Sequence, residues 1–267
     1  MTMNLIYLDL VSSIILMVGC YLVIPLKSIN AKPFSILITA TVCIYGLSSL
    51  IATQNGWDHG VAAALRLSIF FTAFWFAVLC LTSKIAMKLA IVVLPYLTML
   101  SFAVFTLNVL GSENTVDKEI SSAWISFHIL MSLSTYATIS LATMSAFSVF
   151  LSQLSIKNKK SNIFVNFLPA INEADRLQTI LLVVSLFVLF IGIFTGMSVE
   201  YFKSGKLITI DHKTVLSFCT LALISLLLIT NKLFGLRGRF LSRLILVAYF
   251  LISLGYLGVK VISQYFL

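Results

Sequence analysis

The stretch RLQTILLVVSLFVLFIGIFTGMSVE, residues 176–200, decides the fold class of the chain. No residue between Arg176 and Glu200 carries a charge. A helix of about 20 apolar residues crosses the roughly 30 Å hydrocarbon core of a bilayer, so this stretch predicts one transmembrane helix. The unbroken apolar run excludes a barrel strand, whose side chains would alternate between lipid and lumen.

Similar apolar stretches recur along all 267 residues, of which 60% are hydrophobic and 10% charged. The mean hydropathy is +1.07, whereas a soluble domain carries about 25% charged residues. We therefore predict an all-α, polytopic helical bundle in a lipid bilayer, a single transmembrane domain over residues 1–267 with about eight helices. The expected spans are Asn4–Pro25, Phe34–Thr53, Val61–Thr82, Ile85–Val109, Ser122–Gln153, Arg176–Glu200, Lys213–Thr230 and Leu241–Ile262.

The Lys and Arg residues predict the orientation, because cytoplasmic loops are enriched in them. Most of the 18 basic residues fall in alternate connections. We expect these connections in the cytoplasm and both termini on the non-cytoplasmic side of the plasma (inner) membrane. Met1 to Val11 contains no basic residue, so we expect no cleavable signal peptide. The pI of about 9.5 then needs no nucleic-acid partner. The connections that set the orientation carry Lys27, Lys32, Lys84, Lys88, Lys157, Lys159, Lys160, Arg176, Lys232, Arg237, Arg239 and Arg243.

The chain has three histidines, and this topology places all of them near the outer face. His59 follows Trp57 in a loop, where an interfacial anchor is the structural alternative to a functional role. His128 lies within an apolar span, where an ionisable residue is a functional hypothesis by default, although one His can also be a packing donor. His212 opens a helix, where a hydrogen bond to the backbone is the structural alternative to a functional role.

His128 and His212 together are more informative than either one alone. Neutral imidazole is a good ligand for haem iron, and two imidazoles complete its axial coordination. The propionates of haem would need cations near the outer surface, and Arg66 and Lys213 are the candidates. The alternative for Arg66 is a side chain that extends to the lipid head groups.

Small residues mark two faces for close helix packing. One is a stripe with a period of four, and the other is a Gly-x-x-x-Gly pair at Gly192 and Gly196. The four cysteines lie in separate spans without a Cys-x-x-Cys motif, which favours packing over redox or zinc chemistry. The stripe is Ser134, Thr138, Ala142 and Ala146, and the cysteines are Cys20, Cys43, Cys80 and Cys219.

A family resemblance is carried by several motifs in order from about residue 120 to the end. They are FHILMSLSTYATISLATMSA at 127–146, PAINEADRL at 169–177, DHKTVLS at 211–217, FGLRGR at 234–239 and YLGVK at 256–260. With these motifs the chain resembles the cytochrome c assembly (CcsA/CcmC-type) membrane family, and within it the YpjD and HemX-like subgroup. The first four spans match this family only in number and apolar character.

The resemblance implies haem handling in the outer half of the membrane, with His128 and His212 at the positions of the family's histidine pair. It also implies partners among other cytochrome c maturation or membrane proteins. Haem-delivering members carry a Trp-rich outer segment, whereas this chain has only 3 Trp. The resemblance therefore implies an accessory or regulatory haem-binding protein rather than a complete haem lyase.

Two other functions stay open. A membrane transporter, or an accessory subunit of one, would need no haem. We place no Asp or Glu deep within a span, and Pro95 is the only proline well inside one, which weighs against this function. A partner-binding scaffold that retains the fold without haem is the second alternative. No phosphate-binding loop, metal motif or nucleophile elbow indicates an enzyme.

Overall fold

The computed structural model describes residues 2–23, 31–53, 57–58, 60–83, 85–109, 116–117, 123–159, 165, 167–205, 212–235 and 239–254. Within these residues the chain forms long helices and one two-residue ladder, in which Trp57 pairs with Asp117 and Asp58 with Val116. The elements are α1 (Thr2–Val23), α2 (Ala31–Thr53), β1 (Trp57–Asp58), α3 (Val61–Thr82), the 3₁₀ turn η1 (Ala86–Leu89), α4 (Ala90–Val109), β2 (Val116–Asp117), α5 (Ala123–Lys157), α7 (Ile171–Ser204), α8 (His212–Phe234) and α9 (Arg239–Ser253).

This architecture confirms the predicted all-α membrane bundle. Each expected span corresponds to one long helix of the described chain. Six of these helices are long and apolar enough to cross a bilayer, and the apolar parts of α1 and α9, Ile6–Tyr21 and Phe240–Ser253, are shorter. The boundaries differ most at α7, which begins at Ile171 rather than at Arg176. The end of the last expected span, beyond Leu254, lies outside the described residues.

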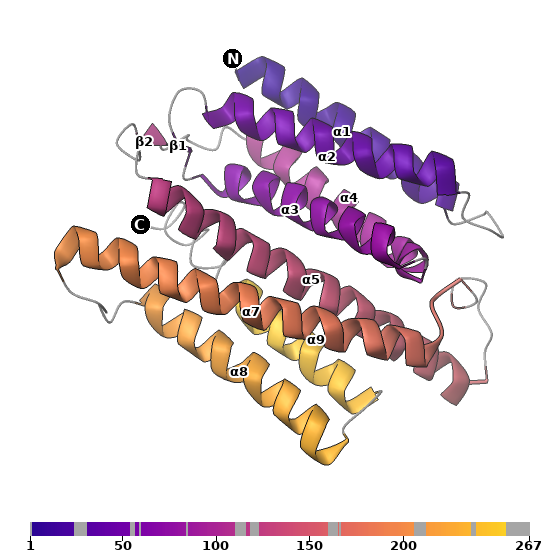
Figure 1. Cartoon of the computed structure of the whole chain (residues 1–267). Coiled ribbons are helices and arrows are strands. Elements are labelled where there is room, and N and C mark those ends of the chain that lie inside the picture. Colours follow the sequence, from indigo (N-terminus) through magenta and orange to yellow (C-terminus); the bar gives the residue numbers. More distant parts are fainter. Residues whose placement is uncertain are drawn as a thin grey trace.

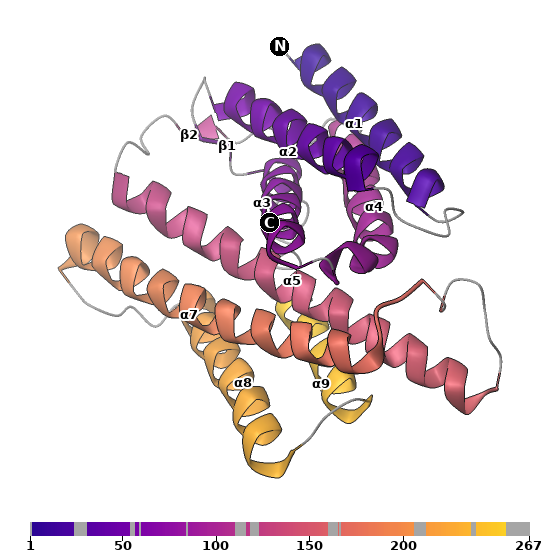
Figure 2. The same cartoon turned by 45° about the vertical axis from the view of Figure 1, so that its right-hand side comes forward.

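The helices form two groups that meet at α5. In the first group, α1 packs on α2 and α4, and α3 packs on α2 and α4. In the second group, α5 packs most extensively on α7, α9 packs on α5 and α8, and α8 packs on α7. Helix α5 also contacts α3, so it lies between the two groups, as the two views show (Figures 1 and 2).

Successive helices run in opposite directions, which gives the bundle two distinct ends (Figure 1). We call one the histidine end, because α5 begins there, with His128 in its second turn, and α8 begins there at His212. Helices α1 and α3 also begin at this end, and α3 follows the β1–β2 ladder directly. We call the other the basic end. It carries Lys88, Lys157, Arg176, Lys232 and Arg243 near the ends of η1, α5, α7, α8 and α9.

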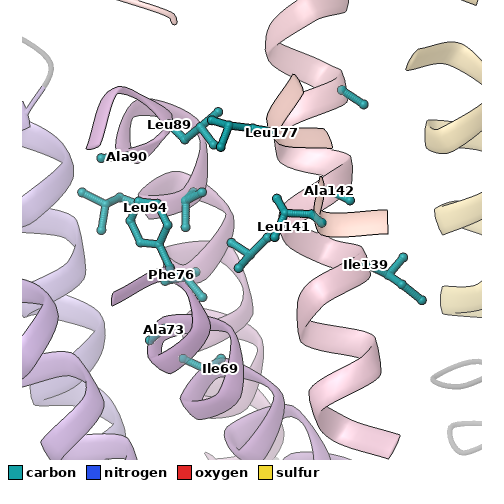
Figure 3. Close-up of a cluster of buried hydrophobic side chains, with 14 of the residues drawn as sticks. Ile69, Ala73, Phe76, Leu89, Ala90, Leu94, Ile139, Leu141, Ala142 and Leu177 are labelled. Atoms are coloured by element: carbon teal, nitrogen blue, oxygen red, sulfur yellow. The ribbon is translucent and has the colours of Figure 1, made fainter. Parts of the chain in front are cut away.

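The largest apolar cluster joins the two groups. Ile69, Ala73 and Phe76 of α3 lie near Leu94 of α4, with Leu141 of α5 on the other side (Figure 3). The predicted small-residue stripe of α5 belongs to this contact region, because its four members are between 0% and 7% exposed. Small side chains let neighbouring backbones approach closely, which drives helix association where no hydrophobic effect operates.

The many hydroxyl groups of α5 are compatible with burial because they bond within their own helix. Ser140 donates to the carbonyl of Tyr136 at 2.8 Å, and Thr143 donates to that of Ile139 at 2.8 Å. A polar group without a partner is costly in hydrocarbon, and this local bonding removes the cost. Helix α5 can therefore be rich in Ser and Thr and still occupy the centre of the bundle.

Candidate functional site

His128 lies in the second turn of α5, and its ring contacts α7. The Nδ1 atom is 2.9 Å from the carbonyl oxygen of Gly192 and 3.4 Å from the hydroxyl of Thr195. Because a carbonyl oxygen can only accept, Nδ1 carries the hydrogen and donates to Gly192. In the neutral ring Nε2 then holds the lone pair. No hydrogen-bond partner for Nε2 lies among the described residues.

The glycines of α7 explain why the imidazole fits there. A Cβ atom at Gly196 would lie 2.8 Å from Cε1 of His128 and 3.2 Å from Nδ1. At Gly192 an added Cβ would meet only Met131, at 3.7 Å, which is an ordinary contact. The predicted Gly-x-x-x-Gly pair is therefore a packing device in which Gly196 makes room for the ring and Gly192 supplies the carbonyl.

His212 and Lys213 open α8 at the same end of the bundle as the start of α5. Their side chains lie outside the described part of the structure, as does the whole of His59. Helix α8 packs on α7 and α9, so α7 is the element that contacts both the ring of His128 and the helix of His212. The assignment of His128 and His212 as a ligand pair stays a prediction.

Arg66 is buried and has a partner that the sequence analysis missed. Its Nε and Nη2 atoms donate to the two carboxylate oxygens of Asp9 at 3.2 and 2.8 Å, and Asn108 donates to the same carboxylate at 2.7 Å. The side chains of Arg66 and Asp9 are 3% and 1% exposed. Extension of Arg66 to the lipid head groups is therefore excluded, and its charge is balanced within the protein.

The expectation that no Asp or Glu lies deep within a span is wrong for Asp9, which is fully buried in α1. The rule that an ionisable residue inside a span needs an explanation could have found it, since it lies within the apolar run of α1. Its presence removes one argument against a transporter. However, three donors from Arg66 and Asn108 already satisfy the carboxylate, which is the arrangement expected of a structural ion pair.

A second polar cluster, also missed by sequence reasoning, lies where α4, α5 and α9 meet. The hydroxyl of Tyr249 is 2.7 Å from that of Tyr96 and 3.1 Å from that of Tyr136. The hydroxyl of Ser140 lies 3.4 Å from that of Tyr249. The hydroxyl of Ser253 lies 3.3 Å from that of Tyr136. A lone Tyr in an apolar span gives no sequence signal for this cluster, because the three residues come from helices far apart in the chain.

A comparison with family models identifies the family, and a second comparison finds a similar protein of unknown role. A family model described as "Cytochrome C assembly protein" matches residues 59–267, which hold α3 to α9 and both residues of the His128–Gly196 contact. The match starts well before residue 120, where the motifs noted in the sequence begin. The chain is also 35% identical over 217 residues to an uncharacterized 28.8 kDa protein of Azospirillum brasilense, named for a nifR3-like 5' region; the alignment covers 81% of this chain and 79% of that protein. Matches of this extent mean that the chain belongs to the cytochrome c assembly protein family.

Proposed function

We propose that the chain binds haem at the histidine end, where His128 and His212 would hold its iron, and acts as an accessory protein in cytochrome c assembly. The family supports a haem-related assembly role. The observation that carries the proposal is the orientation of His128. Its Nδ1 donates to Gly192 at 2.9 Å, which leaves Nε2 with the lone pair.

The side chain of His128 fits the requirements of a haem ligand. A metal-ligating histidine almost always donates its other ring N–H to a carbonyl, carboxylate or water, which fixes the tautomer and the ring plane. His128 has this arrangement without a metal. Haem held by two imidazoles would supply an iron centre that can change its oxidation state.

The surroundings of His128 suit a flat apolar ligand. Trp124 lies one turn earlier on α5 and is 52% exposed, and Phe127 is 41% exposed. Residues four apart lie on the same side of a helix, so the indole is next to the imidazole along α5. For the propionates we retain Lys213, beside His212, as the proposed cation. Arg66 is the weaker candidate, because its guanidinium already pairs with Asp9.

Orientation and the small number of Trp residues define the proposed role further. Basic residues gather at the end opposite to His128 in the described chain, and the positive-inside rule assigns that end to the cytoplasm. Haem would then be bound near the non-cytoplasmic surface, with both termini on that side. The chain has only 3 Trp, so it lacks a Trp-rich segment for presenting haem to an apocytochrome. This favours an accessory over a lyase role, as in the YpjD and HemX-like subgroup.

The test is the absorption spectrum of the purified protein in detergent after haem is added. We expect a low-spin spectrum in the parent, and a high-spin spectrum or loss of binding in His128→Ala and in His212→Ala. His59→Ala is the matched control, since it removes the third of the chain's 3 histidines at the same predicted face. A spectrum that both ligand variants leave unchanged would refute the assignment. Absence of binding in the parent would favour the scaffold or the transporter.

A further inference from the structure

We infer that Gly196 and Thr195 of α7 are positioning residues for His128, which set its tautomer and ring plane so that Nε2 is the ligating nitrogen. The inference rests on the proposed function only for the role of Nε2. The contact itself is a property of the protein without haem. It joins α5 to α7 across 64 residues of sequence.

The position of the ring depends on the absence of a side chain at Gly196. An added Cβ would be 2.8 Å from Cε1, whereas ordinary contacts begin at 3.4 Å. The ring would therefore have to withdraw by about 0.6 Å, because repulsion rises steeply inside van der Waals contact. A withdrawal of this size away from the Gly192 oxygen would lengthen the 2.9 Å separation of Nδ1 and that oxygen beyond the normal range of a hydrogen bond, and we expect the bond to be weakened or lost.

Thr195 supports the same carbonyl from within α7. Its hydroxyl donates to the Gly192 oxygen at 2.9 Å and lies 3.4 Å from Nδ1 of His128. Thr195 is 6% exposed, so its side chain also fills the space beside the ring. The hydroxyl therefore lies against the imidazole at Nδ1, while the missing side chain of Gly196 leaves space for the ring at Cε1.

The two glycines provide a matched pair of substitutions. Gly196→Ala inserts a methyl group against the imidazole, whereas Gly192→Ala inserts one against Met131 at an ordinary distance of 3.7 Å and keeps the carbonyl. Alanine favours a helix more than glycine does, so both variants should keep α7 intact. In Gly196→Ala the group that must move is the end of a side chain, so the fold can be retained while the ring is displaced.

The first measurement is ¹⁵N NMR of the imidazoles in histidine-labelled protein without haem. The 3 histidines can be assigned with His59→Ala and His212→Ala. We expect the His128 signals of the parent and Gly192→Ala to show a protonated Nδ1 and a bare Nε2. Gly196→Ala should show a shifted or mixed tautomer, and Thr195→Val a smaller shift. A His128 ring protonated on Nε2 in the parent, or unchanged signals in Gly196→Ala, would overturn the inference.

The second measurement is titration of the same variants with haem. Loss of a group that orients a metal ligand typically lowers affinity by about 10- to 100-fold, which we expect for Gly196→Ala. Gly192→Ala should keep the parental affinity and low-spin spectrum. Equal haem affinity in the two glycine variants would contradict the positioning role. If the NMR result holds and no variant, parent included, binds haem, the proposed function fails while the positioning of His128 stands. If Gly196→Ala does not fold, Thr195→Val decides the question through the same two measurements.

Discussion

Removal of the buried partner of Asp9 should destabilise the protein strongly. In Arg66→Met the carboxylate of Asp9 loses two of its three donors and keeps only Asn108. Because both side chains are at most 3% exposed, water cannot replace them. Breaking a buried ion pair from one side typically costs about 3–5 kcal/mol, and we expect this range for Arg66→Met and for Asp9→Leu.

The double variant separates an unpaired charge from lost packing. Replacing both partners of a buried pair by apolar residues is often neutral, so Asp9→Leu with Arg66→Met should recover most of the lost stability. The assay is reversible unfolding of the detergent-solubilised protein by SDS, followed by tryptophan fluorescence. Leu10→Ala, on the exposed face of α1, controls for general disturbance of that helix. Single-variant losses below about 1 kcal/mol, or a double-variant loss equal to the sum of the singles, would refute the reasoning.

Three further predictions follow from other contacts. Tyr249→Phe removes the hydroxyl that lies against those of Tyr96 and Tyr136, and it should lower the free energy of unfolding by about 1–2 kcal/mol in the same assay. An unchanged stability would mean that the cluster does not stabilise the fold. Ser134→Ala removes the acceptor of the Trp75 indole N–H, 2.8 Å away, and should lower the free energy of unfolding by about 0.6 kcal/mol. It should also change the indole environment in ultraviolet resonance Raman spectra, and an unchanged Trp75 band would argue against the bond. The third test uses single-cysteine variants in a cysteine-free background and a membrane-impermeant maleimide added to intact cells. The reagent should label Phe202→Cys at the histidine end and not Asn158→Cys at the basic end, and the opposite pattern would invert the proposed orientation.

The sequence predicted the helices well because each apolar run must be helical in lipid. Hydropathy located α7 through its uncharged centre and missed its first turn, where Glu173 and Asp175 are helical but polar. Polar residues end a hydrophobic run without ending a helix, so the two boundaries need not coincide.

The candidate site was only partly predictable. His128 and the glycines of α7 were each identified from the sequence, but their contact depends on how α5 is aligned against α7. The partner of Arg66 depends in the same way on α1 lying beside α4, near the start of α3. Periodicity indicates the face that a residue occupies and not the helix that it meets.

The lengths of α5 and α7 have a consequence for the cytoplasmic surface of the proposed orientation. With 35 and 34 residues, each helix is roughly 50 Å long, about 20 Å more than the hydrocarbon core is thick. A typical tilt of about 20° shortens the projection by only a few ångströms. The first turns of α7 hold the polar residues Glu173 and Asp175, and the next turn bonds to neighbouring helices through Gln178–Ser242 and Asn231–Thr179, so we expect most of the excess length at the basic end. In the proposed orientation the basic ends of α5 and α7 would therefore extend beyond the lipid, and Lys157, the last residue of α5, would lie where soluble proteins can reach it.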